Sequence, residues 1–202
     1  MTGLPTDQPQ AADQRRSEAY VTYVLKLCDN KRTRSDLRSG LGRPVQRCNY
    51  LHRYLVPYLP EQQHRDTRRA HYAIAALIAG RPRASRDADA TADQAQSPTW
   101  WKRPNLGASL ANAVRKGTLK PDSAEGELHL LTRQSSDAIH IRLPALTRHL
   151  LTSGVPIDWA VLLEDLTWWN RNQDQIATRW LEAYFRVLST QDATTNPQEN
   201  NA

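Results

Sequence analysis

The stretch GVPIDWAVLLEDLTWW, residues 154–169, decides the fold class of this chain. Asp158 follows a turn that contains a proline, so it can cap a helix, and Ile157 before it can pack against Leu162 as a hydrophobic staple. Large apolar residues then recur at helical spacing and form one wide apolar face: Trp159, Leu162, Leu163, Leu166 and Trp169. The stretch therefore predicts an amphipathic helix that is covered by other helices.

The same periodicity extends outward through most of the chain. Apolar residues recur at helical spacing, and no segment shows the sustained alternation that a half-buried strand requires. Short connections between the C-terminal helices favour antiparallel neighbours. We therefore predict an all-α fold of two packed helical parts, in which the C-terminal part is a four-helix bundle.

Composition divides the chain into five segments. The predicted linker or mobile loop is rich in Arg, Ala, Asp, Gln and Ser and has no large apolar residue. Within the N-terminal part, Ser17 can cap the first helix. We predict an N-terminal helical part at residues 15–82, the linker at residues 83–99 and a C-terminal helical bundle at residues 100–189. Disordered tails precede and follow them, at residues 1–14 and 190–202.

Positive charge is concentrated in one segment. Residues 31–53 carry seven Arg and Lys residues and a single acidic residue, Asp36, so their local excess of six equals the formal charge of the whole chain, +6. A field concentrated in this way can attract a polyanion without making the entire surface adhesive. Nucleic acid is the first partner that this charge pattern indicates.

The spacing of the arginines in this segment supports the same partner. Arg34 and Arg38 are four residues apart, as are Arg43 and Arg47, so on helices each pair would project from one face. The glycines and proline of residues 39–44 predict a bend between the pairs. Arginine suits bidentate contact to phosphate oxygens. The alternative is a solvated charged face without a function.

The sequence gives no support to a membrane protein, a secreted protein, a metal-binding protein or an enzyme with a known motif. No apolar stretch approaches the roughly 20 residues of a membrane span, and no secretory signal is visible, so the default location is the cytoplasm. Cys28 and Cys48 suggest buried thiols. The histidines show no metal-binding spacing, and no nucleophile elbow, Walker loop or Gly-rich dinucleotide turn is present. We therefore expect no metal, no cofactor and no catalytic residue.

Four segments give the chain a family resemblance that covers most of residues 106–185. The most specific part runs from Asp158-Trp159 to Trp168-Trp169, and Asp36-Leu37-Arg38 adds a weaker similarity in the N-terminal half. The chain resembles the CasB family, the small subunits of the type I-E CRISPR surveillance complex called Cascade, through the segments SLANAV (109–114), IHIRL (139–143), VPIDW (155–159) and DLTWW (165–169).

The resemblance implies an all-helical, non-catalytic subunit. Its implied partners are other Cascade subunits, guide RNA, the target and displaced DNA strands, and a second copy of itself. The subunit would help to hold the R-loop through the nucleic-acid backbone, while pairing with the guide supplies the sequence specificity. Arg38 and Arg142 match positions where relatives tend to carry a basic residue.

Further basic residues are candidates for phosphate contact in the C-terminal half. Arg115 and Lys116 end a helix, where the macrodipole alone favours cations. Arg142 and Arg148 could instead pair with carboxylates on a neighbouring helix. The predicted nucleic-acid-binding residues are Arg34, Arg38, Arg43, Arg47, Arg115, Lys116, Arg142 and Arg148.

The tryptophans divide into two groups. Trp100 and Trp101, beside Lys102 and Arg103, could form an aromatic platform for unpaired bases, although such a pair more often anchors a loop on the core. The others fall at core spacing, so we expect them to be structural: Trp159, Trp168, Trp169 and Trp180.

Two alternative functions remain open at this stage. A free-standing helical DNA-binding regulator would use residues 40–44 as the turn of a helix-turn-helix motif and would show sequence preference at a symmetric site. A hydrolase that uses Asp, Glu and His is the third class, because missing motifs do not exclude an enzyme.

Overall fold

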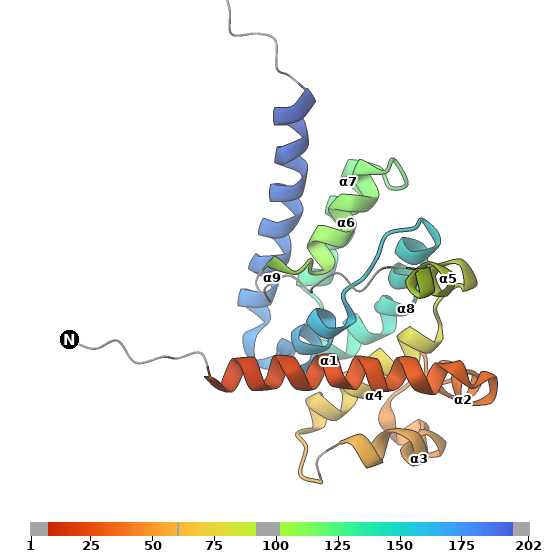
Figure 1. Cartoon of the computed structure of the whole chain (residues 1–202). Helices are drawn as coiled ribbons and strands as arrows, with labels where there is room; N and C mark the ends of the chain where they lie inside the picture. The colour runs from red at the N-terminus through yellow and green to blue at the C-terminus, as the bar shows by residue number, and fades with distance from the viewer. Residues whose placement is uncertain (1–7, 60, 92–101, 196–202) are drawn as a thin grey trace, which may run out of the picture.

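The computed structural model describes residues 8–59, 61–91 and 102–195 (Figure 1). In this described part, the regular elements are α-helices and short 3-10 helices, without a strand, which confirms the all-α prediction. None of the helices in these ranges has the length and apolar character needed to cross a membrane. The four-helix arrangement of residues 100–189 stays a prediction.

The helices are unequal in length. In the N-terminal half, α2 and α4 are joined by α3 and three single-turn 3-10 helices: η1 (Val45–Arg47), η2 (Asn49–Leu51) and η3 (Val56–Tyr58). The α-helices are α1 (Gln8–Asp29), α2 (Lys31–Arg38), α3 (His52–Leu55), α4 (Arg65–Ala79), α5 (Arg83–Thr91), α6 (Leu106–Arg115), α7 (Pro121–Thr132), α8 (Ser136–Thr152) and α9 (Trp159–Thr195).

The long helix α9 is the centre of the fold. It packs against α6 within the C-terminal half and against α4 and α1 of the N-terminal half. Figure 1 shows α1 crossing in front of α4, with α2 and α3 at the lower right and the loop between α6 and α7 near the top. The two halves of the chain therefore share one buried core.

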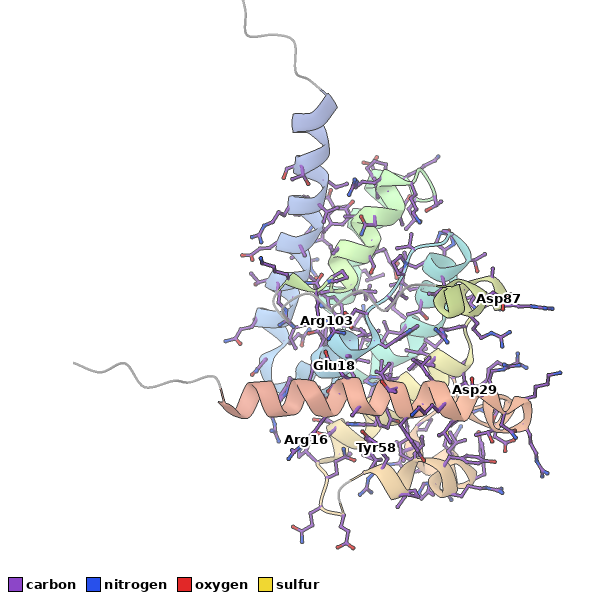
Figure 2. All side chains as sticks on the ribbon, viewed as in Figure 1. Arg16, Glu18, Asp29, Tyr58, Asp87 and Arg103 are labelled. Atoms are coloured by element: carbon purple, nitrogen blue, oxygen red, sulfur yellow. The ribbon has the colours of Figure 1, made fainter. Side chains whose placement is uncertain are left out.

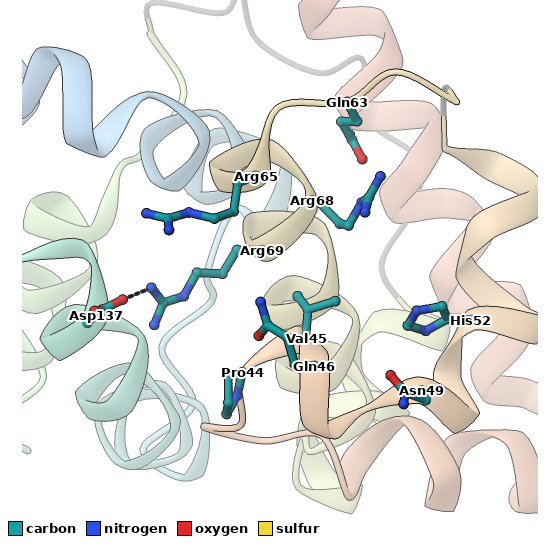
Figure 3. Close-up of a pocket in the computed structure, with 10 residues that line it drawn as sticks. All are labelled: Pro44, Val45, Gln46, Asn49, His52, Gln63, Arg65, Arg68, Arg69 and Asp137. Atoms are coloured by element: carbon teal, nitrogen blue, oxygen red, sulfur yellow. Dashed lines mark hydrogen bonds and ion pairs between the residues drawn. The ribbon is translucent and has the colours of Figure 1, made fainter.

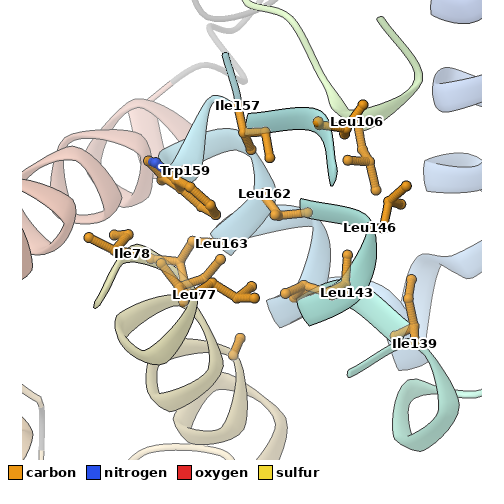
Figure 4. Close-up of a cluster of buried hydrophobic side chains, with 14 of the residues drawn as sticks. Leu77, Ile78, Leu106, Ile139, Leu143, Leu146, Ile157, Trp159, Leu162 and Leu163 are labelled. Atoms are coloured by element: carbon orange, nitrogen blue, oxygen red, sulfur yellow. The ribbon is translucent and has the colours of Figure 1, made fainter. Parts of the chain in front are cut away.

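The start of α9 confirms the sequence prediction. Oδ1 of Asp158 accepts hydrogen bonds from the backbone N–H groups of Ala160 and Val161, at 3.2 and 3.1 Å. Ile157 and Leu162 are both buried in the cluster that α4, α6, α8 and α9 form (Figure 4). This local signal positions the helix that the rest of the core covers.

A kink divides α9 into two halves. Asn172 has non-helical backbone angles, φ −130° and ψ 31°. Across the kink, the rings of Trp169 and Trp180 lie 5.0 Å apart, and Nε1 of Trp180 donates a hydrogen bond of 2.7 Å to Oδ2 of Asp165. The second half therefore packs back on the first.

The carboxyl group of Asp165 makes the stability of the folded protein depend on pH. Burial raises the pKa of Asp165 from 3.8 to about 7, against the opposing effects of Arg179 and of the Trp180 hydrogen bond. The folded protein thus holds the proton more tightly than the unfolded chain. The resulting stability is fully present below pH 3.8 and is lost as the pH rises to about 7.

We expect Asp165→Asn to remove this dependence, because an amide has no proton to lose in this range. Urea unfolding at several values between about pH 4 and pH 8 would measure the free energy of unfolding of both proteins. The wild-type protein should lose stability relative to the variant as the pH rises. If the difference in unfolding free energy between the two proteins stays constant with pH, the pKa of Asp165 is not raised.

Several predicted segment boundaries differ from the structure. Helix α1 already begins at Gln8, so residues 8–14 are helical and Ser17 lies inside the helix, where its hydroxyl donates a hydrogen bond to Glu164 instead of capping. Residues 83–91, predicted as a linker or mobile loop, form α5, and α9 extends to Thr195, into the predicted C-terminal tail. The rest of the predicted linker lies outside the described residues.

Candidate nucleic-acid interface

Helix α2 presents the first pair of predicted arginines. The side chain of Asn30 caps the helix by accepting from the backbone N–H groups of Arg32 and Thr33. Arg38 at the C-terminal end is exposed, whereas Nη1 of Arg34 donates a hydrogen bond of 3.3 Å to the backbone oxygen of Cys28. Arg38 is therefore available to a ligand, and Arg34 is partly committed to the end of α1.

The second pair follows a turn. Gly40 is buried, and a Cβ there would lie 2.9 Å from Cδ1 of Leu51, while Gly42 has φ of +67°, which favours glycine. Arg43 precedes η1 and Arg47 ends it, so the expectation that this pair shares one helix face is wrong. The left-handed backbone at Gly42 and the proline at residue 44 keep a regular helix from continuing through both arginines. Both arginines are nevertheless exposed.

The single acidic residue of this segment does not neutralise the arginines. Oδ2 of Asp36 accepts a hydrogen bond of 2.6 Å from the hydroxyl of Tyr54, and this bond raises the pKa of Tyr54. Within the described residues, Arg38, Arg43 and Arg47 have no carboxylate within ion-pair distance. Their charges therefore face solvent.

The structure adds arginines that the sequence analysis missed. Arg65 and Arg68, on the first turns of α4, line a pocket of about 580 Å³ together with Pro44, just before η1, and Gln46 of η1 (Figure 3). Arg69 lies at the edge of this basic pocket, where it pairs with Asp137 of α8. The spacing of residues 65, 68 and 69 would place them on one helix face, which was the signal available in the sequence.

Helix α8 lies next to the same surface. A Cβ on Gly42 would be 4.0 Å from Cγ of Pro144, and Arg148, one turn further along α8, is exposed. Arg142 differs, because its Nη2 lies 2.9 Å from Oε2 of Glu127 on α7. Of the two candidates on α8, Arg148 is therefore exposed to solvent, whereas Arg142 is held in an ion pair.

Arg115 and Lys116 lie elsewhere. They stand at the C-terminal end of α6, before the loop that leads to α7, and Figure 1 shows this loop far from α2. Nζ of Lys116 donates a hydrogen bond to the backbone oxygen of Gly154, and Arg115 is exposed. The structure does not bring these two residues into contact with the arginines of residues 34–47.

Arg103 connects the two halves of the chain. Its Nε and Nη2 donate hydrogen bonds of 2.6 and 2.7 Å to the two carboxylate oxygens of Asp158, and its Nη1 pairs with Glu18 of α1 (Figure 2). Only 11% of the side chain is exposed, so Arg103 is structural. Trp100 and Trp101, the predicted aromatic platform beside it, lie outside the described residues.

The remaining tryptophan and cysteine predictions are confirmed with one exception. Trp159, Trp169 and Trp180 are buried, but Trp168 is 37% exposed, so the expectation that it belongs to the core is wrong. The reason is its place on the helix, because Trp169 takes the buried face and its neighbour turns outward. The thiols Cys28 and Cys48 are free and buried, and burial raises the pKa of Cys28 to about 11.

The geometry does not assemble a metal centre in the part of the chain that the structure covers. No group of three or more His, Cys, Asp or Glu side chains in residues 8–59, 61–91 and 102–195 is arranged to hold a metal ion. The most distinctive polar feature is instead the exposed arginine surface around the turn between α2 and η1, with the basic pocket beside it.

Comparisons with known proteins agree with this fold. Two solved chains, described as "CRISPR RNA-guided surveillance complex, pre-nicking" and "CRISPR RNA-guided surveillance complex", are 37% and 36% identical to this chain, with TM-scores of 0.80 and 0.78. Each match covers 91% of this chain and 99% of the other. A third, "Crystal structure of M. ruber CasB", is 21% identical with a TM-score of 0.73, covers 90% and 98% of the two chains, and supports the fold alone.

A family comparison gives the same result over most of the chain. No curated protein sequence matches the chain significantly. The family model for CRISPR-associated protein Cse2, however, matches residues 33–185, which include most of α2, the basic pocket and most of α9. With this match, the chain belongs to the Cse2/CasB family of CRISPR-associated proteins.

Proposed function

We propose that this chain is a non-catalytic small subunit of a type I-E CRISPR surveillance complex, which stabilises the R-loop between guide RNA and target DNA. The observation that carries the proposal is the exposed surface of Arg38, Arg43 and Arg47, whose charges have no carboxylate partner in the described residues. Arg65, Arg68 and Arg148 extend this surface across α4 and α8.

The proposed contacts are to the nucleic-acid backbone. In RNA-guided recognition, base pairing with the guide supplies sequence specificity, so a protein subunit needs only to hold phosphates. Arginine is well suited to this task, since its guanidinium group can donate two parallel hydrogen bonds to phosphate oxygens. Guide RNA, the target strand and the displaced strand all present such phosphates.

The proposed protein partners follow from the relatives. Two chains that share more than a third of their residues with this one are described as parts of an RNA-guided surveillance complex. We therefore propose other Cascade subunits as partners, and from the family resemblance we also propose a second copy of this chain. Purification from the native cells should recover guide RNA and Cascade subunits together with this chain, and their absence would contradict the proposal.

Replacing Arg38 and Arg47 together by Ala tests the arginine surface. Each neutralised phosphate steepens the dependence of log K on log salt concentration by about 0.7 to 0.9, so the double variant should flatten the slope by about 1.4 to 1.8. Binding of a fluorescent oligonucleotide at several salt concentrations would measure this slope. An unchanged slope would remove the segment from the interface.

Arg142→Ala is a matched control for this experiment. Arg142 is also an arginine at the surface, but it pairs with Glu127, so its loss should leave the slope close to that of the wild-type protein. A flattening equal to that of the Arg38 and Arg47 variant would show that general positive charge, and not this surface, sets the salt dependence.

The structure gives no support to the alternative of a sequence-specific regulator. In a helix-turn-helix motif, the turn leads into a recognition helix that lies in the major groove. Here the turn at residues 39–44 leads into η1, which has only three residues. Such a segment is too short to read base edges along a groove.

A further inference from the structure

A second hollow, of about 630 Å³, opens on the other side of the α4 N-terminus from the basic pocket. It lies between α1, the segment that joins η3 to α4, the first turns of α4 and the first half of α9. We call it the aromatic hollow, because the side chains that line it include Tyr58, Gln62, Gln63, Thr67, His71 and Trp168.

The two large aromatic rings of this hollow are unusually exposed. Trp168 is 37% exposed and Tyr58 is 36% exposed, whereas the neighbouring Trp169 is completely buried. The guanidinium carbon of Arg171 lies 5.4 Å from the Trp168 ring. An aromatic ring that stays accessible at a hollow, next to a cation, is typical of a surface that binds a partner.

Tyr58 is held in place before any ligand arrives. Its ring stacks on Tyr23 of α1 with centroids 4.7 Å apart and an interplanar angle of 20°, and Tyr20 contacts it at 5.5 Å. The Tyr23 hydroxyl in turn donates a hydrogen bond of 2.6 Å to the backbone oxygen of Tyr54. Figure 2 shows Tyr58 below α1, on the same side as Arg16. The hollow therefore has a pre-organised aromatic wall.

The aromatic hollow and the basic pocket meet at Gln63, which lines both. From the first turns of α4, Arg65 and Arg68 face the basic pocket, while Thr67 and His71 face the aromatic hollow. Cationic side chains thus lie on one side of this helix end and aromatic rings on the other. A single nucleic-acid strand presents the same two kinds of group, phosphates on one side and bases on the other.

Gln63 also has unused hydrogen-bonding capacity at this junction. Its Oε1 is buried and has no hydrogen-bond partner in the described part of the chain, although its Nε2 lies 3.5 Å from Nδ1 of His71. A buried acceptor without a partner is costly, and the N–H edge of a base could satisfy it.

We propose that the aromatic hollow receives an unpaired base of a single strand whose phosphates lie in the basic pocket. The proposal rests on the proposed function and deepens it, because it assigns this end of α4 to single-stranded rather than duplex nucleic acid. Stacking on aromatic rings beside a basic groove binds single strands without regard to sequence. The continuity of the hollow with a cationic pocket favours this occupant over an apolar segment of a protein.

The test compares strands with and without bases. Full-length protein is titrated with a fluorescent thymidine 12-mer and with a 12-mer of abasic nucleotides, which keeps the phosphates but loses the rings. The wild-type protein should bind the thymidine strand about 5- to 150-fold more tightly, the range expected for one stacked base. Trp168→Leu should remove most of this preference and leave the affinity for the abasic strand unchanged.

Two further variants make the result specific. Trp168→Phe keeps an aromatic face and should restore much of the preference. Phe185→Leu is the matched control, since Phe185 is 45% exposed on the second half of α9 and does not line the hollow. Trp168 does not belong to the hydrophobic core cluster of the described residues, so its replacement should leave the protein folded. Thermal unfolding of each variant would check this.

The outcomes separate this inference from the proposed function. Arg65→Ala with Arg68→Ala should weaken both strands equally, through lost phosphate contacts. If Trp168→Leu binds both strands as the wild-type protein does, the hollow does not take a base, and the arginine variants still test the proposed function. If Trp168→Leu instead loses copurifying Cascade subunits and keeps its strand preference, the occupant is a protein and the inference is overturned.

Discussion

Asp158→Ala is expected to lower the free energy of unfolding by up to about 3–5 kcal/mol, the cost of removing one partner from a buried ion pair. One carboxylate performs two tasks. It caps α9 through the backbone N–H groups of Ala160 and Val161, and it pairs with Arg103, whose side chain is only 11% exposed. Loss of the cap alone accounts for about 1 kcal/mol. The larger part comes from the guanidinium group of Arg103, which would keep only the more exposed Glu18 as its partner.

A double-mutant cycle separates these contributions. Asp158→Asn should retain most of the cap and lose the ion pair, and Arg103→Met should lose the ion pair while keeping the apolar stem. Chemical unfolding of the single and double variants gives the coupling energy between the two residues. Coupling below about 0.5 kcal/mol would contradict the assignment of Asp158 and Arg103 as a stabilising buried ion pair.

The two roles of Asp158 differ in how far they could be predicted from sequence. The cap and the staple depend on residues within five positions of one another, so the sequence alone predicts them correctly. The ion pair joins Asp158 to Arg103, 55 residues earlier, and through it to Glu18 on α1. Local pattern carries no information about such a contact, and Arg103 therefore looked like a residue beside an aromatic platform.

The candidate interface likewise combines features that the sequence predicts with features that depend on tertiary packing. The density of arginines in residues 31–47 is a local property, and three of the four predicted residues there are exposed without a carboxylate partner in the described part of the chain. Arg65 and Arg68 join this surface only because α4 folds next to η1. Arg142 is paired because α7 brings Glu127 beside it. Tertiary packing thus decides which cations remain available.

Gly107→Ala is expected to destabilise the protein by more than about 3 kcal/mol, because it overpacks a contact between two backbones. A Cβ at residue 107 would lie 1.9 Å from the backbone oxygen of Trp180 and 2.6 Å from its carbonyl carbon. No rotamer change can relieve a clash with main-chain atoms. The helices α6 and α9 would have to separate, and Trp180, now completely buried, would lose part of its packing.

Gly126→Ala provides the matched control in the same half of the chain. Gly126 lies inside α7, and a Cβ there would meet no atom within 4 Å. The substitution should stabilise the protein by up to about 1 kcal/mol, since alanine is the better helix former. Thermal and urea unfolding of the two variants should therefore shift in opposite directions. Equal and small effects at both positions would show that α6 and α9 are not packed backbone to backbone, and the placement of α9 at the centre of the fold would then be wrong.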